Sequence, residues 1–244
     1  MNAADNDGRL LDVQGVVKRF GGFTALNGVD LHVNKGERFG LIGPNGSGKT
    51  TMINCISGAL ANDGGQIVFK GQKLDGKKPH ERTRLGIARS FQIPKPFGTM
   101  TVLENLAIPL EYATDTPSGQ VRDKAMDILE SIGLSERADY NSGSLTQIDM
   151  RRLELARAMA ASPDLLISDE AMAGLSSNEV DDILEILFKL NERGITIIMI
   201  EHIMRAVMRF SERIAVLDAG EKIAEGTPDE VVNNPKVERA YLGE

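Results

Sequence analysis

Cysteine, tryptophan and long apolar runs are scarce or absent in this sequence of 244 residues. Cys55 is the single cysteine, so no disulfide can form within the chain. Its apolar neighbours Met52, Ile53 and Ile56 predict a packing role for it rather than a reactive one. Apolar runs such as 197–200 are far shorter than the ~20 residues that cross a bilayer. We therefore expect neither a disulfide-stabilised fold nor a membrane-spanning helix.

An excess of basic residues is also absent, since 35 acidic residues outweigh 28 basic ones and the formal net charge is −7. Free-standing nucleic-acid binders usually carry a positive excess, so we expect no nucleic-acid partner. The polar stretch 1–9 lacks the apolar core of a signal peptide and is expected to be flexible. These features predict a cytoplasmic protein that reaches a membrane only by docking on other subunits.

Two kinds of periodicity divide the rest of the chain. Strand-like runs are expected at 11–17, 29–33, 39–42, 66–70, 86–91, 165–168 and 195–200, with helices at 49–60 and 178–191. Between 93 and 162 the pattern changes to helical stretches at 102–110, 120–132 and 150–161, which predicts a helical insertion. Apolar strands that alternate with helices indicate an α/β fold with a parallel sheet.

The most specific motif is a glycine-rich loop placed between an expected strand and an expected helix. It reads Gly43-Pro44-Asn45-Gly46-Ser47-Gly48-Lys49-Thr50, which matches G-x-x-x-x-G-K-[ST]. The glycines let successive backbone N–H groups point inward around phosphate oxygens, and the helix N-terminus adds a favourable partial charge. We expect Lys49 to reach the β- and γ-phosphates, Thr50 to ligate Mg²⁺ and Thr51 to meet the α-phosphate. The loop therefore predicts a site for ATP and Mg²⁺.

A pair of acidic residues follows the apolar strand that begins at Leu165. We expect Asp169 to hold Mg²⁺ through water, and Glu170 to orient and deprotonate an attacking water. Ser168 stands where another apolar residue is expected. An acid pair after a strand is a weak signal alone, but with the phosphate-binding loop upstream it predicts ATP hydrolysis.

With these two motifs in order, the sequence resembles the ATP-binding subunits of ABC transporters over about residues 10–244. The resemblance implies a P-loop NTPase core of the ABC ATPase type, formed by 10–92 and 163–244. It also implies an antiparallel N-terminal β subdomain, a helical subdomain at 93–162, and ATPase activity with ATP and Mg²⁺ bound.

The resemblance also assigns roles to residues outside the two motifs. Phe20 matches the aromatic residue that stacks on adenine, although a strand-end core residue is the alternative. Gln92 matches the glutamine that senses Mg²⁺ and the γ-phosphate, and His202 matches the histidine that contacts the γ-phosphate. The segment Gly174-Leu175-Ser176-Ser177 matches the position of the family's D-loop, and its polar residue, Ser176, is also a candidate helix N-cap.

Within this family the sequence is most similar to importer subunits for branched-chain amino acids and similar solutes. The residues that carry this likeness are Arg19-Phe20-Gly21-Gly22, Asn54-Cys55-Ile56-Ser57-Gly58, Thr101-Val102-Leu103-Glu104-Asn105-Leu106, Gly226-Thr227-Pro228, Asn234-Pro235 and Ala240-Tyr241-Leu242-Gly243-Glu244. The likeness implies a peripheral subunit on the cytoplasmic face of the membrane. Its partners would be transmembrane permease subunits, a second ATP-binding subunit and, indirectly, a periplasmic or extracellular solute-binding protein.

One family motif departs from the pattern. The signature, close to Leu-Ser-Gly-Gly-Gln in the family, corresponds here to Leu145-Thr146-Gln147-Ile148-Asp149. Ile148 adds bulk where glycine permits close approach to the partner's ATP, and Asp149 adds negative charge near that anion. We interpret this as one degenerate site in a heterodimer. The alternatives are a lineage-specific change tolerated by rearrangement, and a regulatory nucleotide-binding subunit with negligible turnover.

Overall fold

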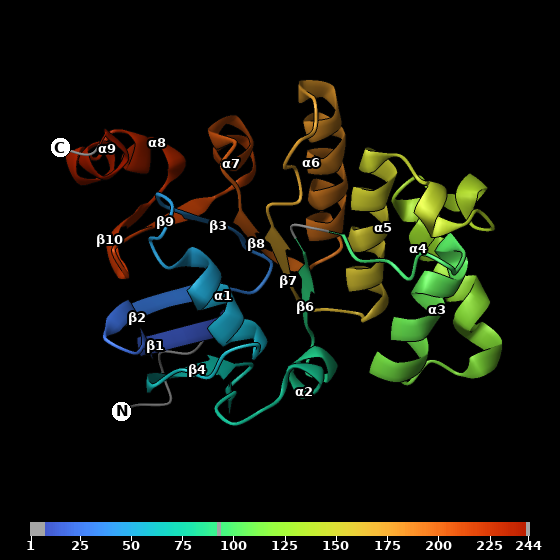
Figure 1. Cartoon of the computed structure of the whole chain (residues 1–244), viewed down its shortest axis with the longest axis horizontal. Helices are drawn as coiled ribbons and strands as arrows, with labels where there is room; N and C mark the ends of the chain where they lie inside the picture. The colour runs from blue at the N-terminus through green and yellow to red at the C-terminus, as the bar shows by residue number, and fades with distance from the viewer. Residues whose placement is uncertain (1–7, 92–93, 243–244) are drawn as a thin grey trace.

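The computed structural model describes residues 8–91 and 94–242, whose strands form two β-sheets (Figure 1). The first sheet is antiparallel and has the order β2-β1-β4-β5. Its strands are β1 (Arg9–Phe20), β2 (Phe23–Asn34), β4 (Gly64–Phe69) and β5 (Gln72–Lys73).

The second sheet has the order β10-β9-β3-β8-β7-β6, and every neighbouring pair is parallel except β10 with β9. Its strands are β3 (Arg38–Ile42), β6 (Ile87–Ser90), β7 (Leu165–Asp169), β8 (Thr196–Ile200), β9 (Arg213–Asp218) and β10 (Glu221–Gly226). The carboxyl ends of parallel strands meet at one edge of a sheet, where ligands bind in open α/β folds.

Helices α3 (Val102–Ala113), α4 (Val121–Ser131) and α5 (Gln147–Ala160) form a helical group at one end of the molecule (Figure 1). Helix α3 packs on both α4 and α5, and α5 joins the group to the main sheet by contacting β6. The other helices are α1 (Lys49–Ser57), α2 (Pro79–Arg84), α6 (Ser177–Glu192), α7 (Met204–Phe210), α8 (Pro228–Val232) and α9 (Pro235–Leu242).

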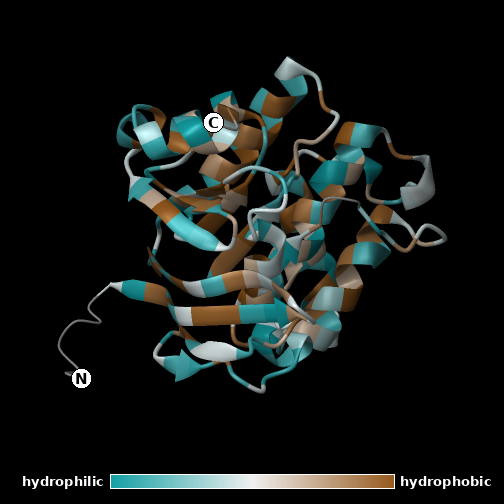
Figure 2. Cartoon of the chain, turned by 60° about the vertical axis from the view of Figure 1, so that its left-hand side comes forward, coloured by the Kyte–Doolittle hydropathy of each residue, from teal (hydrophilic) through white to brown (hydrophobic). Residues whose placement is uncertain are grey.

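Two clusters of buried side chains cover the two faces of the main sheet, and brown hydrophobic segments of the chain gather in the interior of the molecule in Figure 2. Successive residues of a strand point to opposite faces. Accordingly Ile197 and Met199 pack with the helices, whereas Ile198 and Ile200 pack with α1 and the antiparallel sheet. No helix among residues 8–91 and 94–242 is long and apolar enough to cross a membrane.

The structure confirms the expected strands and helices, with several changed boundaries. Helix α1 ends at Ser57 rather than residue 60, because Gly58 adopts the left-handed conformation (φ 84°) that closes the helix. Helix α5 begins at Gln147 rather than residue 150, because Thr146 caps it by accepting a hydrogen bond from the Asp149 N–H. Strands β5, β9 and β10 and helices α2 and α7 were not expected. Strand β1 begins at Arg9, and the rest of the stretch expected to be flexible lies mostly outside the described residues.

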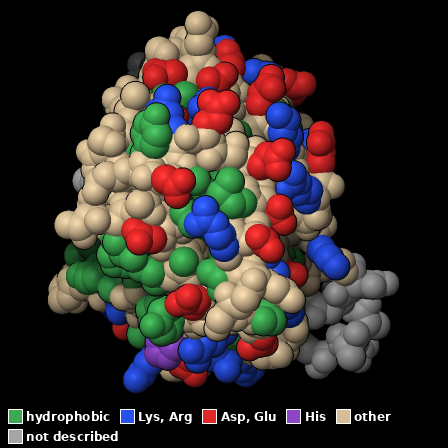
Figure 3. Space-filling model, turned by 90° about the vertical axis from the view of Figure 1, so that its right-hand side faces the viewer, with side chains coloured by type: hydrophobic (Ala, Val, Ile, Leu, Met, Phe, Trp, Pro, Cys, Tyr) green, Lys and Arg blue, Asp and Glu red, His purple; other side chains and the backbone are tan. Residues whose placement is uncertain are grey.

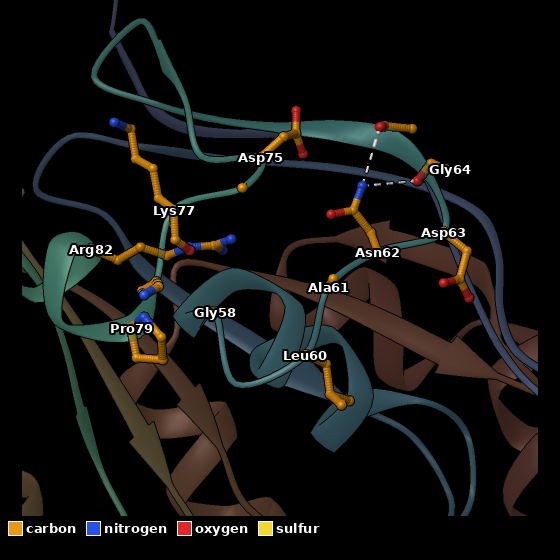
Figure 4. A pocket seen from close by; sticks show the side chains of 13 residues that line it. Gly58, Leu60, Ala61, Asn62, Asp63, Gly64, Asp75, Lys77, Pro79 and Arg82 are labelled. Atoms are coloured by element: carbon orange, nitrogen blue, oxygen red, sulfur yellow. Dashed lines mark hydrogen bonds between the residues drawn. The ribbon is translucent and has the colours of Figure 1, made fainter.

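A hollow of about 480 Å³ lies between the end of α1, β4 and α2 (Figure 4). Arg82 lines it, but the guanidinium donates hydrogen bonds to the backbone oxygens of Cys55, Ile56, Leu74 and Lys77. Two of these carbonyls belong to the last turn of α1, which lacks donors of its own. Arg82 is therefore a structural cap that fixes the far end of the helix that starts at the glycine-rich loop.

Replacing this cap is expected to destabilise the fold. Arg82→Met leaves buried carbonyls without a donor and should lower the free energy of unfolding by about 2–4 kcal/mol. Urea denaturation followed by circular dichroism measures the change. Arg84→Met, on the exposed side of the same helix, serves as the control and should stay within about 0.5 kcal/mol of wild type. An equal loss in both variants would contradict the capping role.

Candidate nucleotide-binding site

The glycine-rich loop joins the end of β3 to the start of α1 and stands at the carboxyl edge of the main sheet. Gly46 and Gly48 have φ of 81° and 105°, a region that side chains disfavour. A Cβ on Gly48 would also lie 2.8 Å from the backbone oxygen of Ala25 in β2. The backbone of the loop therefore packs against the antiparallel sheet in a way that only glycine allows.

Two polar side chains inside this loop fit an anion. The Nζ of Lys49 donates to the carbonyl oxygens of Gly43 and Pro44 at 2.7 and 3.0 Å, and burial lowers its pKa while Glu170 and Asp169 raise it. The hydroxyl of Ser47 is buried and has no hydrogen-bond partner among the described residues. Phosphate oxygens would give both groups strong acceptors. The loop therefore fits the nucleotide phosphates that its sequence predicts.

A cavity of about 250 Å³ opens on the same loop, and the predicted aromatic residue lines it. Phe20 is 47% exposed, so it is not the core residue of the alternative interpretation. Phe23, which is 62% exposed, stands across the turn and was not predicted. Glu170 and His202 line the cavity from the main sheet, together with residues 45–51 of the loop and helix.

Two of the three predicted catalytic side chains, those of Glu170 and His202, lie together, and the third, Gln92, lies outside the described residues. Glu170 follows β7 and His202 follows β8, and the Nε2 of His202 lies 3.1 Å from Oε1 of Glu170. The Glu170 backbone has a φ of 48° and its N–H donates to the Ile200 carbonyl at 2.9 Å. This turn of the backbone directs the carboxylate out of the strand toward the loop cavity.

A second cavity, of about 360 Å³, is lined by Thr50 and Asp169, the residues predicted to hold Mg²⁺. Within residues 8–91 and 94–242, no group of three or more His, Cys, Asp or Glu side chains is placed to hold a metal. Mg²⁺ usually takes only one or two protein ligands besides waters and phosphate oxygens, so a hydroxyl and a carboxylate fit it. Gln92, the third predicted ligand, lies outside the described residues.

Arg89 contacts Asp169 and was not predicted. Its guanidinium donates to Oδ2 of Asp169 at 2.6 Å and to Oδ1 of Asn54 at 2.7 Å. The partners lie 80 and 35 residues away in sequence, so no local pattern signals them. The contact engages Oδ2 of Asp169, so Arg89 restricts the orientation of this carboxylate.

The signature segment differs from the expectation. Asp149 is buried in the first turn of α5 and forms ion pairs with Arg137 and Arg152, so its negative charge is compensated. The hydroxyl of Thr146 donates to the same carboxylate. Ile148 packs partly buried on the core of the helical group. The charge penalty predicted for Asp149 is therefore reduced, and the Thr146 hydroxyl is engaged within the chain.

Glu201 is a buried acid that sequence reasoning missed. Its Oε1 accepts a hydrogen bond from the Met172 N–H at 2.9 Å, just beyond Glu170 in the chain. Burial and the nearby Glu170 carboxylate raise the pKa of Glu201 to about 7, against the opposing effects of backbone N–H groups and Arg151. Glu201 is thus a buried ionisable group directly before His202 and close to Glu170.

Comparison with known proteins defines the class of this fold and site. Residues 26–173 match the family model of the ABC transporter, and residues 221–244 match that of the branched-chain amino acid ATP-binding cassette transporter. The chain belongs to the ABC transporter family of ATP-binding proteins, and its members are ATPases. The P-loop NTPase core of the ABC type, with its helical insertion and antiparallel β subdomain, is confirmed.

Individual relatives extend this assignment over almost the whole chain. The high-affinity branched-chain amino acid transport ATP-binding protein LivG of Escherichia coli (strain K12) is 41% identical, with 96% of this chain and 98% of that protein covered. BraF of Pseudomonas aeruginosa is 38% identical over the same shares. The crystal structure of an ABC transporter cassette in its ADP conformation is 36% identical with a TM-score of 0.88, and covers 97% of this chain and 99% of its own.

The raised pKa of Glu201 predicts a pH-dependent change in stability. Between its unfolded pKa of ~4.3 and its folded pKa of about 7, the folded state binds more protons than the unfolded state. The free energy of unfolding therefore falls as the pH rises through this range. Glu201→Gln cannot ionise, so its stability relative to wild type should increase from pH 5 to pH 8. Urea denaturation across this range measures the difference, with the exposed Glu192→Gln as control. A pH-independent difference would contradict the shift.

Proposed function

We propose that this chain is the ATP-hydrolysing subunit that energises a membrane importer for branched-chain amino acids or a similar solute. The observation that carries the proposal is the meeting of Glu170, His202 and the glycine-rich loop around one cavity. The proposed substrate class comes from the relatives, which are named as branched-chain amino acid transport proteins and are similar to this chain over nearly their full length.

In the proposed reaction the phosphates of ATP bind in the loop at residues 43–48, and Lys49 turns from the loop carbonyls to the β- and γ-phosphates. Glu170 accepts a proton from the water that attacks the γ-phosphorus, while the bond to the leaving oxygen of ADP breaks. His202, next to Glu170, orients the γ-phosphate and the water. Thr51 meets the α-phosphate, and Phe20 stacks on the adenine ring with Phe23 beside it.

Mg²⁺ supplies charge neutralisation between the β- and γ-phosphates when it is bound. We assign Thr50 and Asp169 as the residues that hold it, with Gln92 as a further ligand. Arg89 fixes the orientation of the Asp169 carboxylate through the contact with Oδ2.

Transmembrane permease subunits are the proposed partners, docked between the main sheet and the helical group. A cleft of about 260 Å³ lies there between α1, α2 and β6 on one side and α3 and α5 on the other. The helical end of the molecule carries both signs of charge, with hydrophobic side chains gathered in its lower part (Figure 3). Phe97, which is 44% exposed, is available for docking. This arrangement supports the proposed division into a core (10–92 and 163–244) and a helical subdomain (93–162). We place the subunit peripherally on the cytoplasmic face of the membrane. A solute-binding protein outside the membrane would act through the permease.

A second, different ATP-binding subunit is proposed as the dimer partner. Ile148 stands where close approach to the partner's ATP is needed, and Asp149 engages the Thr146 hydroxyl. The site completed by this chain's signature would therefore hydrolyse ATP poorly, while the site built on Lys49 and Glu170 is completed by the signature of the partner.

Loss of the proposed base should abolish turnover. In the assembled transporter Glu170→Gln is expected to reduce steady-state ATP hydrolysis on the order of 100-fold and to retain ATP binding. Glu185→Gln, exposed on α6, is the control and should match wild type. If wild type never exceeds Glu170→Gln with any combination of partners, the regulatory subunit with negligible turnover is the correct alternative.

Restoring the signature tests the proposed asymmetry. Ile148→Gly with Asp149→Gln, combined with Glu170→Gln to stop turnover, should strengthen ATP-dependent self-association of the isolated chain. The reason is that glycine removes the bulk that prevents close approach. Sedimentation velocity with and without ATP measures the dimer fraction against Glu170→Gln alone. An unchanged dimer fraction would remove the claim that the signature is impaired.

A further inference from the structure

Three side chains from other parts of the chain form hydrogen bonds with the backbone of segment 172–174, which follows Glu170. Glu201, directly after β8, accepts from the Met172 N–H at 2.9 Å. Arg151 of α5 donates to the Ala173 oxygen at 3.0 Å, and Gln147 of the same helix donates to the Gly174 oxygen at 3.3 Å. Each of the three consecutive residues 172–174 thus has one side-chain partner. One partner follows β8, and the other two lie on successive turns of α5.

Gln147 and Arg151 are four residues apart and therefore lie on the same face of α5, one turn from each other. The approach at Gly174 is close, because a Cβ built there would lie 2.8 Å from Nε2 of Gln147. Gln147 is also a residue of the signature segment. The helix that begins with the signature is thereby joined to the segment 172–174 in the same chain.

The held segment is itself joined to the proposed base. The Ala173 N–H donates to the Glu170 oxygen and the Leu175 N–H to the Met172 oxygen, both at 3.2 Å. These turns leave little freedom between Glu170 and the segment. A displacement of the segment therefore changes the position of the Glu170 backbone.

Two of the three side chains are charged and buried. Arg151 is 8% exposed and Glu201 is 3% exposed, and they approach the segment from α5 and from the end of β8. Glu154 and Glu201 are the acids that face Arg151, and Glu170 and Arg151 are the charged groups that face Glu201. Burying ionisable groups costs free energy that an apolar contact would avoid, so stability alone gives little reason for this arrangement.

We propose that Gln147, Arg151 and Glu201 are positioning residues that transmit the position of helix α5 to Glu170. This inference rests on the proposed function, because it assumes that Glu170 is the base and that the signature meets a partner's ATP. Closure of the signature over that ATP would then set the geometry for hydrolysis at this chain's own loop. The two nucleotide sites would be coupled within one subunit.

The test compares Arg151→Met, Glu201→Gln and their combination in the assembled transporter. Each single variant should lower kcat for ATP about tenfold and leave KM within about twofold, because positioning acts on the reacting geometry rather than on binding. The combined loss should be smaller than the product of the single losses, because both residues hold one segment. Arg151→Lys should recover part of kcat. Arg193→Met and Glu192→Gln, both exposed, are the matched controls.

Hydrogen exchange of the backbone amides at 172–175 is the second measurement, and it does not depend on turnover. It should become faster in the variants than in wild type and the controls. Unchanged kcat, or a rise in KM that accounts for the whole loss, overturns the proposal while the ATPase assignment stands. If wild type shows no turnover above Glu170→Gln, the proposed function fails, and unchanged exchange at 172–175 then overturns the positioning role as well.

Discussion

Parallel pairing of β3, β8 and β7 is the constraint on which the rest of this molecule depends. The register pairs Gly40 with Met199 and Asp169 with Ile200, so the three strands end at the same edge of the sheet. The glycine-rich loop, the acid pair and His202 each begin at the end of one of these strands. This parallel pairing brings residues more than 150 positions apart in the sequence to one cavity.

Acidic side chains at this edge lie against basic side chains from separate elements. Asp169 is paired with Arg89 of β6, Glu170 lies against His202, and Glu201 faces Arg151 of α5. Each pairing reduces the cost of burying a carboxylate near the phosphates. Because Arg89 comes from the main sheet and Arg151 from α5, a relative movement of the helical group and the sheet changes the electrostatics of the site as well as its shape.

The sequence was most informative where function depends on residues that lie close together along the chain. The loop at 43–50 was predicted in full because its glycines and Lys49 act through local backbone geometry, and the acid pair at 169–170 was predicted because it ends an apolar strand. Arg89, Arg151 and Glu201 were missed because their partners lie 22 to 80 residues away. The start of α5 was misplaced because the capping contact of Thr146 was hidden inside the signature motif.

Cys55 lies fully buried in α1, and burial raises the pKa of its thiol to about 11. At neutral pH it therefore remains a protonated thiol without access to solvent, and such thiols react slowly with oxidants and electrophiles. Since it is the single cysteine of the sequence, nothing on the protein surface responds to the thiol–disulfide balance of the surroundings. The helix that carries the phosphate-binding loop therefore contains no thiol that is readily oxidised or alkylated.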